Sequence, residues 1–146
     1  MAKKMTRPMY TPKENQANLP FSSTATPPTF PDLDSHPANP FVWSLAADGA
    51  GKIWAGTWGG GLFKQKDDTF DYAPGLTNFL SPTPALLFVG NKLWIGTSEG
   101  ALLYQNGNVS RFKEIAGQPF VDVRAIVRDK SGALWFDTAG DGLICL

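Results

Sequence analysis

The chain has 146 residues, which is enough for one domain with a hydrophobic core. Its 13 Lys and Arg residues balance 13 Asp and Glu residues, so no long-range attraction to nucleic acid or to an anionic membrane is built in. The single cysteine, Cys145, excludes an internal disulfide and a cysteine zinc site.

Residues 1–40 are rich in proline and carry eight of the 12 prolines in the chain. They show neither the alternation of a strand nor the period of a helix, and proline favours extended backbone. We therefore expect a flexible or extended arm over 1–40. The alternative is that a part of it, such as Thr6–Tyr10, adds an edge strand to a sheet.

The sequence as written shows no segment for export or for membrane insertion. The N-terminus lacks the apolar run of ~7–15 residues of a secretory signal, and no stretch approaches the ~20 apolar residues of a membrane span. We therefore expect a soluble chain, and any export signal would lie outside this sequence.

Short apolar runs alternate with tight-turn residues from Phe41 onward. Pairs such as Gly90-Asn91 and Asn106-Gly107 favour hairpin turns, because they supply positive φ at little steric cost. The predicted strands are Phe41–Asp48, Lys52–Trp58, Gly61–Lys66, Thr69–Ala73, Ala85–Val89, Lys92–Ser98, Ala101–Gln105, Val109–Lys113, Val123–Asp129, Ala133–Thr138 and Gly142–Leu146.

A five-residue motif recurs three times in this region. It reads Ile53-Trp54-Ala55-Gly56-Thr57, then Leu93-Trp94-Ile95-Gly96-Thr97, then Leu134-Trp135-Phe136-Asp137-Thr138, and its tryptophans are 40 and 41 residues apart. Four short antiparallel strands per ~40 residues are typical of a β-propeller blade. The sequence therefore predicts an all-β fold of about three blades, over 41–84, 85–120 and 121–146.

The motif residues are predicted to build the blades. We expect Trp54, Trp94 and Trp135 to pack between blades, and a stacking site for a sugar or a base is the alternative. A glycine at the fourth position, as in Gly56 and Gly96, would let a neighbouring backbone approach. The other predicted structural residues of the motif are Thr57, Thr97 and Thr138.

The pattern Leu/Ile-Trp-x-Gly-Thr-x-x-Gly-Gly/Ala-Leu, preceded by Asp-x-x-Gly, resembles the two-component-regulator propeller repeat. The resemblance covers roughly 42–146, and the third copy departs from it, because Asp137 and Asp141 replace glycines. In that family the repeats form seven-bladed sensor domains of bacterial hybrid histidine kinases, ahead of a membrane span and a kinase. The resemblance implies a periplasmic or otherwise extracytoplasmic sensor of a small molecule such as a carbohydrate. Without it, the chain would be expected in the cytoplasm.

Ligand-binding residues are expected on the side of the blades that collects the longer loops. The candidates there are Trp58, Glu99 and Asp141, an exposed ring and two carboxylates at related positions. The sequence predicts no catalytic residue, no metal site and no cofactor. The one histidine, His36, lies in the arm, so an enzyme similar to propeller lyases is disfavoured. The other alternative is a scaffold that binds a protein through the same loops.

Three blades are fewer than the ~4–8 of a closed propeller. We therefore expect one of three situations: a fragment of a larger sensor, a ring assembled from several chains, or an open stack covered by the arm.

Overall fold

The computed structural model of the chain describes residues 41–77, 79, 81–115 and 117–146. All regular structure in these residues is β-strand, which forms two four-stranded sheets, one three-stranded sheet and one short hairpin. The described part of the chain is therefore all-β, as the sequence predicts. The predicted arm over 1–40, with the alternative edge strand at Thr6–Tyr10, lies outside the described residues.

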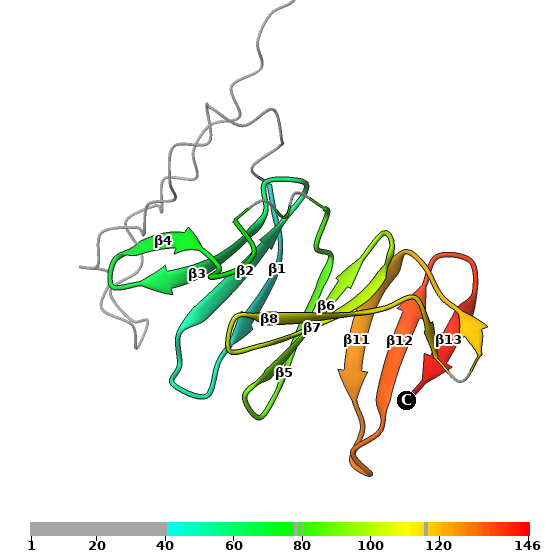
Figure 1. The fold of residues 1–146 in the computed structure, drawn as a ribbon. Coiled ribbons are helices and arrows are strands. Elements are labelled where there is room, and N and C mark those ends of the chain that lie inside the picture. Colours follow the sequence, from blue (N-terminus) through cyan, green and yellow to red (C-terminus); the bar gives the residue numbers. More distant parts are fainter. Residues whose placement is uncertain (1–40, 78, 80, 116) are drawn as a thin grey trace, which may run out of the picture.

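Each sheet is an antiparallel meander in which consecutive strands are hydrogen-bonded neighbours (Figure 1). The first sheet consists of β1 (Val42–Ala47), β2 (Ile53–Thr57), β3 (Leu62–Lys66) and β4 (Thr69–Tyr72). The second consists of β5 (Ala85–Val89), β6 (Lys92–Thr97), β7 (Gly100–Gln105) and β8 (Asn108–Phe112). After the hairpin of β9 (Glu114–Ile115) and β10 (Gln118–Pro119), the third sheet consists of β11 (Val123–Arg128), β12 (Leu134–Thr138) and β13 (Gly142–Cys145).

The strands of the three sheets agree with the predicted ranges to within one residue at each end. Their turns are locally encoded: Asp67 and Asn106, for example, adopt φ values of 53° and 51°, which Asp and Asn tolerate in tight turns. The β9–β10 hairpin is a difference, because the sequence predicts a long connection there. Its two-residue strands are too short to show an apolar pattern.

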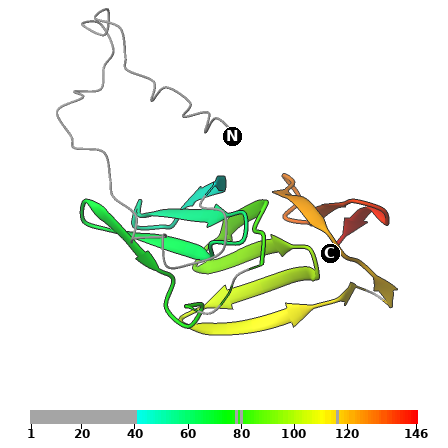
Figure 2. The same cartoon turned by 90° about the horizontal axis from the view of Figure 1, so that it is seen from above.

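The first strands of the three sheets lie next to one another. β5 contacts both β1 and β11, and Figure 2 shows these three strands on the same side of the molecule. The later strands of each sheet lie farther from this line. The sheets therefore stack face to face around a common inner side, which is the arrangement of propeller blades.

Trp54 lies in the seam between the first and second sheets. Its side chain is 3% exposed, and its ring meets those of Phe88 and Tyr104 edge-on, with centroids 5.6 and 5.4 Å apart. Buried aliphatic side chains of both sheets and of the connection between them complete the cluster: Leu62, Leu76, Leu93, Ile95 and Leu102. Because this seam buries large apolar groups from both sides, it stabilises the packing of the two sheets.

Trp94 occupies the same motif position in the seam between the second and third sheets. It is 6% exposed, and its ring is edge-on to Phe136 with the centroids 5.5 Å apart. Phe120 and Val123 are fully buried in the same cluster. The two seams thus repeat one packing arrangement with different partner side chains.

The motif glycines allow the following sheet to approach closely. A Cβ atom on Gly56 would lie 2.7 Å from the carbonyl oxygen of Thr83, and one on Gly96 would lie 2.7 Å from that of Val123. Thr83 lies two residues before β5, and Val123 is the first residue of β11. A side chain at either glycine would therefore push the inner strand of the next sheet away.

The third sheet has an apolar face that is exposed. Trp135 is 36% exposed there, and Val127, its partner across the β11–β12 pairing, is also exposed. Leu143, 64% exposed, pairs with Asp137, the residue that replaces the motif glycine. We call Val127, Trp135, Asp137 and Leu143 the open face. The expected packing between sheets is thus seen for Trp54 and Trp94, whereas Trp135 lies on the open face, because the structure describes no sheet beyond it.

The threonine that ends each motif closes the turn to the next strand. The hydroxyl groups of Thr57, Thr97 and Thr138 donate hydrogen bonds of 2.8, 2.9 and 2.8 Å to a glycine carbonyl three or four residues later. All three threonines are buried. Because a buried hydroxyl is costly without a partner, these bonds explain threonine at this position.

Two aspartates hold the tryptophans of the first and third sheets from the preceding turn. The indole N–H of Trp54 donates to Asp48 over 3.2 Å, and that of Trp135 donates to Asp129 over 2.8 Å. The other carboxylate oxygen of each aspartate accepts backbone N–H groups of its turn. The Ser131 hydroxyl and the Trp135 indole, together with these N–H groups, lower the pKa of Asp129 to about 2.

Candidate functional site

One cavity lies where the three sheets meet, and we call it the three-sheet cavity. It has a volume of about 630 Å³, and its lining residues are Trp43, Trp58, Pro82, Pro84, Ser98, Asp122 and Arg124. They lie near the starts of β1, β5 and β11 or just after β2 and β6. Because consecutive strands run in opposite directions, these ends belong to the same side of the sheets, where sequence analysis expects the longer loops.

Trp43 and Arg124 enter the cavity from equivalent positions in two sheets. The pairing of β1 with β2 and that of β11 with β12 each skip one residue, which is Trp43 in the first case and Arg124 in the second. Such a bulge changes the direction of a side chain relative to the regular ladder. Pro84, directly before β5, takes the corresponding place in the second sheet. One repeat position therefore supplies three walls of the cavity.

Two tryptophan rings form the aromatic part of the cavity. The rings of Trp43 and Trp58 have centroids 3.9 Å apart and planes inclined by 59°, and the side chains are 50% and 46% exposed. The backbone N–H of Trp58 donates to the Phe41 carbonyl over 2.9 Å, which fixes the chain beside β1. Unlike Trp54 and Trp94, these rings leave much of their surface open to a ligand.

An ion pair forms the polar part of the cavity. Arg124 donates to the Asp122 carboxylate over 3.0 Å, and both side chains are exposed. The backbone of Asp122 joins the second and third sheets, since its N–H donates to the Ser98 carbonyl over 3.0 Å and its carbonyl accepts from Ala139 over 3.1 Å. An exposed ion pair adds little stability, and a guanidinium carries five N–H donors. Arg124 therefore retains donors for the oxygen atoms of a ligand.

The structure places the three predicted candidates differently. Trp58 lines the three-sheet cavity. Glu99 follows the cavity residue Ser98 but is not a lining residue, and its backbone N–H is bonded to the Thr97 hydroxyl over 3.1 Å. Asp141 is also outside the lining, and its carboxylate accepts the backbone N–H of Val121 over 3.2 Å. Of the three candidates, Trp58 alone is a lining residue of this cavity.

The sequence does not predict Trp43 and Arg124 as site residues, because both fall inside predicted strands, where side chains are expected to alternate regularly. One signal could have found them. Each lies 11 residues before the motif tryptophan of its repeat. A large aromatic ring and a guanidinium at the same repeat position are candidates for a shared surface.

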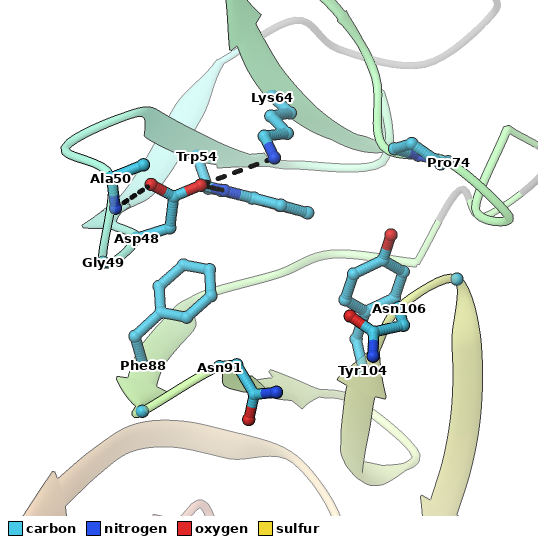
Figure 3. A pocket seen from close by; sticks show the side chains of 12 residues that line it. Asp48, Gly49, Ala50, Trp54, Lys64, Pro74, Phe88, Asn91, Tyr104 and Asn106 are labelled. Atoms are coloured by element: carbon cyan, nitrogen blue, oxygen red, sulfur yellow. Dashed lines mark hydrogen bonds and ion pairs between the residues drawn. The ribbon is translucent and has the colours of Figure 1, made fainter.

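A second cavity of about 670 Å³ lies at the opposite ends of the first two sheets (Figure 3). Its charged groups are bonded to each other: the ammonium of Lys64 lies 3.4 Å from the Asp48 carboxylate and 5.0 Å from the centroid of the Trp54 ring. Burial raises the pKa of Asp48, but hydrogen bonds from Trp54, Lys52, Ala50 and Lys64 outweigh it and hold that pKa below its usual 3.8. These contacts stabilise the turn and the seam between the first two sheets. This second cavity is therefore a weaker candidate for a ligand site than the three-sheet cavity.

Within the ranges that the structure describes, no group of three or more His, Cys, Asp and Glu residues could hold a metal ion. No helix long and apolar enough to cross a membrane occurs in those same ranges.

A family comparison identifies the repeat. Residues 36–59 match the family model described as "Two component regulator propeller". This stretch includes β1 and the Trp54 motif. The chain therefore carries a propeller repeat of the two-component-regulator type, which is the repeat that the sequence pattern resembles.

Two solved structures share the fold. One is the "extracellular domain of the putative hybrid two component system BT4673 from B. thetaiotaomicron", with a TM-score of 0.56, 19% identity, and coverage of 77% of this chain and 16% of that one. The other is "YCF48 bound to D1 peptide", with a TM-score of 0.54, 14% identity, and coverage of 75% and 37%. The chain thus spans a minor part of either protein, and no curated protein matches it.

Proposed function

We propose that this chain is a non-enzymatic, ligand-sensing propeller segment of a bacterial two-component-type signalling protein, with the three-sheet cavity as its ligand site. The observation that carries the proposal is the convergence of Trp43, Pro84 and Arg124 from equivalent repeat positions, together with Trp58, on one cavity. The type of the propeller repeat and the fold shared with the extracellular domain of a putative hybrid two component system support the signalling context.

The chemistry of the cavity suits a carbohydrate-like ligand. Exposed aromatic rings such as Trp43 and Trp58 can stack on the apolar face of a sugar ring. Arg124 offers N–H donors, and Asp122 and Ser98 offer oxygen acceptors for hydroxyl groups. A few polar groups among apolar walls are typical of small-molecule sites. In this proposal the ligand is extracytoplasmic, and the segment contributes to transmembrane signalling to a kinase.

Replacing Trp58 by alanine tests the site. We expect Trp58→Ala to weaken ligand binding by about 5- to 150-fold, because stacking on one ring contributes roughly 1–3 kcal/mol. A thermal-shift screen with neutral and acidic oligosaccharides would find the ligand by linkage, and calorimetry would give its affinity for both proteins.

Trp135→Ala is the matched control, since it removes a partly exposed tryptophan outside the cavity. It should leave the affinity unchanged. If every saccharide that binds does so equally well to Trp58→Ala, the three-sheet cavity is not the site.

A second candidate function is a scaffold that binds an extended peptide in the same cavity. The observation in its favour is the combination of two tryptophans with Pro82 and Pro84, because aromatic-lined grooves recognise proline-rich peptides. One structure with the same fold is also described as bound to a peptide. Binding of a protein in a pull-down, without any saccharide response in the thermal-shift screen, would favour this function.

A further inference from the structure

We propose that the proline-rich segment 27–40 of this chain binds in the three-sheet cavity and competes there with the external ligand. The inference rests on the proposed function in one respect, that the three-sheet cavity is a ligand site. The new element is that a segment of the chain itself occupies this site. Its competition lowers the apparent affinity of the site for the external ligand.

The cavity has the features that recognise a polyproline helix. The rings of Trp43 and Trp58 are in contact, with centroids 3.9 Å apart and planes inclined by 59°, so they form an angled apolar wall instead of one flat platform. Pro82 and Pro84 extend its apolar wall. Grooves lined by aromatic rings bind proline-rich segments, because a polyproline helix is preformed and loses little conformational entropy on binding.

The segment 27–40 has the matching composition. It reads Pro-Pro-Thr-Phe-Pro-Asp-Leu-Asp-Ser-His-Pro-Ala-Asn-Pro and so contains five of the 12 prolines of the chain. It also carries two carboxylates, Asp32 and Asp34, and no Lys or Arg. The exposed guanidinium of Arg124 is paired with Asp122 at the cavity, and it retains N–H donors that can bind those carboxylates.

The segment is attached to the described part of the chain beside the cavity, at Phe41. Phe41 follows Pro40 directly, and its carbonyl accepts the backbone N–H of Trp58. Trp43 lies only two residues later. A polyproline helix advances ~3.1 Å per residue, so a few residues are enough to cross the cavity from Phe41. A short tether gives an effective concentration on the order of 1 mM, so even weak binding would fill the site.

Calorimetry with a synthetic peptide of residues 27–40 tests the proposal on the full chain. In one variant the five prolines of the segment are replaced by serine: Pro27→Ser, Pro28→Ser, Pro31→Ser, Pro37→Ser and Pro40→Ser. The peptide should bind this variant about tenfold more tightly than the wild type, because the wild-type segment competes with it. Adding Trp58→Ala to the variant should abolish binding of the peptide.

The chain offers a matched control, because the first 20 residues contain three further prolines. The control variant carries Pro8→Ser, Pro12→Ser and Pro20→Ser, and it should bind the peptide as weakly as the wild type. Equal affinity of the peptide for the wild type and the five-serine variant would overturn the competition. Failure of the peptide to bind the five-serine variant would overturn the recognition itself.

A parallel titration with a saccharide found in the thermal-shift screen keeps the two proposals apart. Tighter saccharide binding by the five-serine variant supports both of them. Equal saccharide affinity for the wild type and this variant overturns competition by the segment and leaves the ligand site standing. If no saccharide binds either protein, the carbohydrate proposal fails, and the peptide titration still decides whether the segment binds.

Discussion

At the scale of single residues, the aspartate before the motif does more than end a turn. One carboxylate oxygen of Asp129 accepts a hydrogen bond from the Trp135 indole N–H. The other oxygen accepts hydrogen bonds from the Ser131 hydroxyl and from two backbone N–H groups. Asp48 does the same for Trp54 without a hydroxyl donor. The second sheet has the tighter Gly90-Asn91 turn at this place, and the Trp94 ring packs against those of Phe112 and Phe136.

Asp129→Asn should make unfolding less sensitive to acid. The folded-state pKa of about 2 lies below the ordinary value of 3.8, so the carboxylate contributes stability that is complete above pH ~4 and is lost as the pH falls towards 2. The variant lacks this contribution and should melt at a lower temperature than the wild type at pH 6. Melting followed by circular dichroism should show that the difference shrinks between pH 4 and pH 2.

Asp137→Asn serves as the control, because it removes the same charge from the same sheet outside this turn. A difference between wild type and Asp129→Asn that stays constant down to pH 2 would contradict the assigned role of the carboxylate.

At the scale of elements, stacking of the sheets depends on the motif glycines as much as on the tryptophans. The inner strand of the following sheet passes directly over Gly56 and Gly96. The third sheet carries Asp137 at this position. Another sheet could not pack on the open face in the same way, because a carbonyl oxygen would meet the side chain of Asp137.

Gly96→Ala should separate the second and third sheets. The new Cβ would lie 2.7 Å from the Val123 carbonyl oxygen and 2.9 Å from the Cβ of Ala85, so the backbone has to shift. We expect a loss of about 1–3 kcal/mol in the free energy of unfolding, measured by urea denaturation. Gly140→Ala is the control, because a Cβ there has no atom within 4 Å. Equal stability of the two variants would show that the close approach is unimportant.

At the scale of the molecule, the described residues form a stack whose third-sheet end carries an exposed apolar face. In the two seams the equivalents of Trp135 and Leu143 are buried, whereas Trp135, Leu143 and Val127 themselves are in contact with water. Exposed apolar patches of this kind promote association. None of the open-face residues lines the three-sheet cavity.

Leu143→Glu should reduce self-association of the chain without unfolding it. Leu143 is 64% exposed, so the free energy of unfolding should change by no more than about 0.5 kcal/mol. Sedimentation velocity over a range of concentrations should show a smaller fraction of oligomers than for the wild type. Ser110→Glu, which adds the same charge on the exposed side of β8, is the control and should behave as the wild type. Unchanged association of Leu143→Glu would mean that another surface is responsible.

The strands were predictable because their signals are local. Turn residues such as Asn106-Gly107 mark the ends of short apolar runs, and the spacing of Trp54, Trp94 and Trp135 defines the repeat.

The cavity was only partly predictable. Trp58 follows from its place after a strand, but the bulges that expose Trp43 and Arg124 are a property of strand register, which one strand alone does not encode. Asp141 is engaged by a backbone N–H 20 residues away, a contact that only the folded chain creates.

The register of the third sheet has a practical consequence. Cys145 pairs with Trp135 across β12 and β13, and it is exposed and the only thiol of the chain. A maleimide-linked fluorophore at this one thiol would therefore lie beside the tryptophan on the open face. Energy transfer from the indole to the dye, and shielding of the dye from a dissolved quencher, would report optically on any molecule that covers this end of the stack.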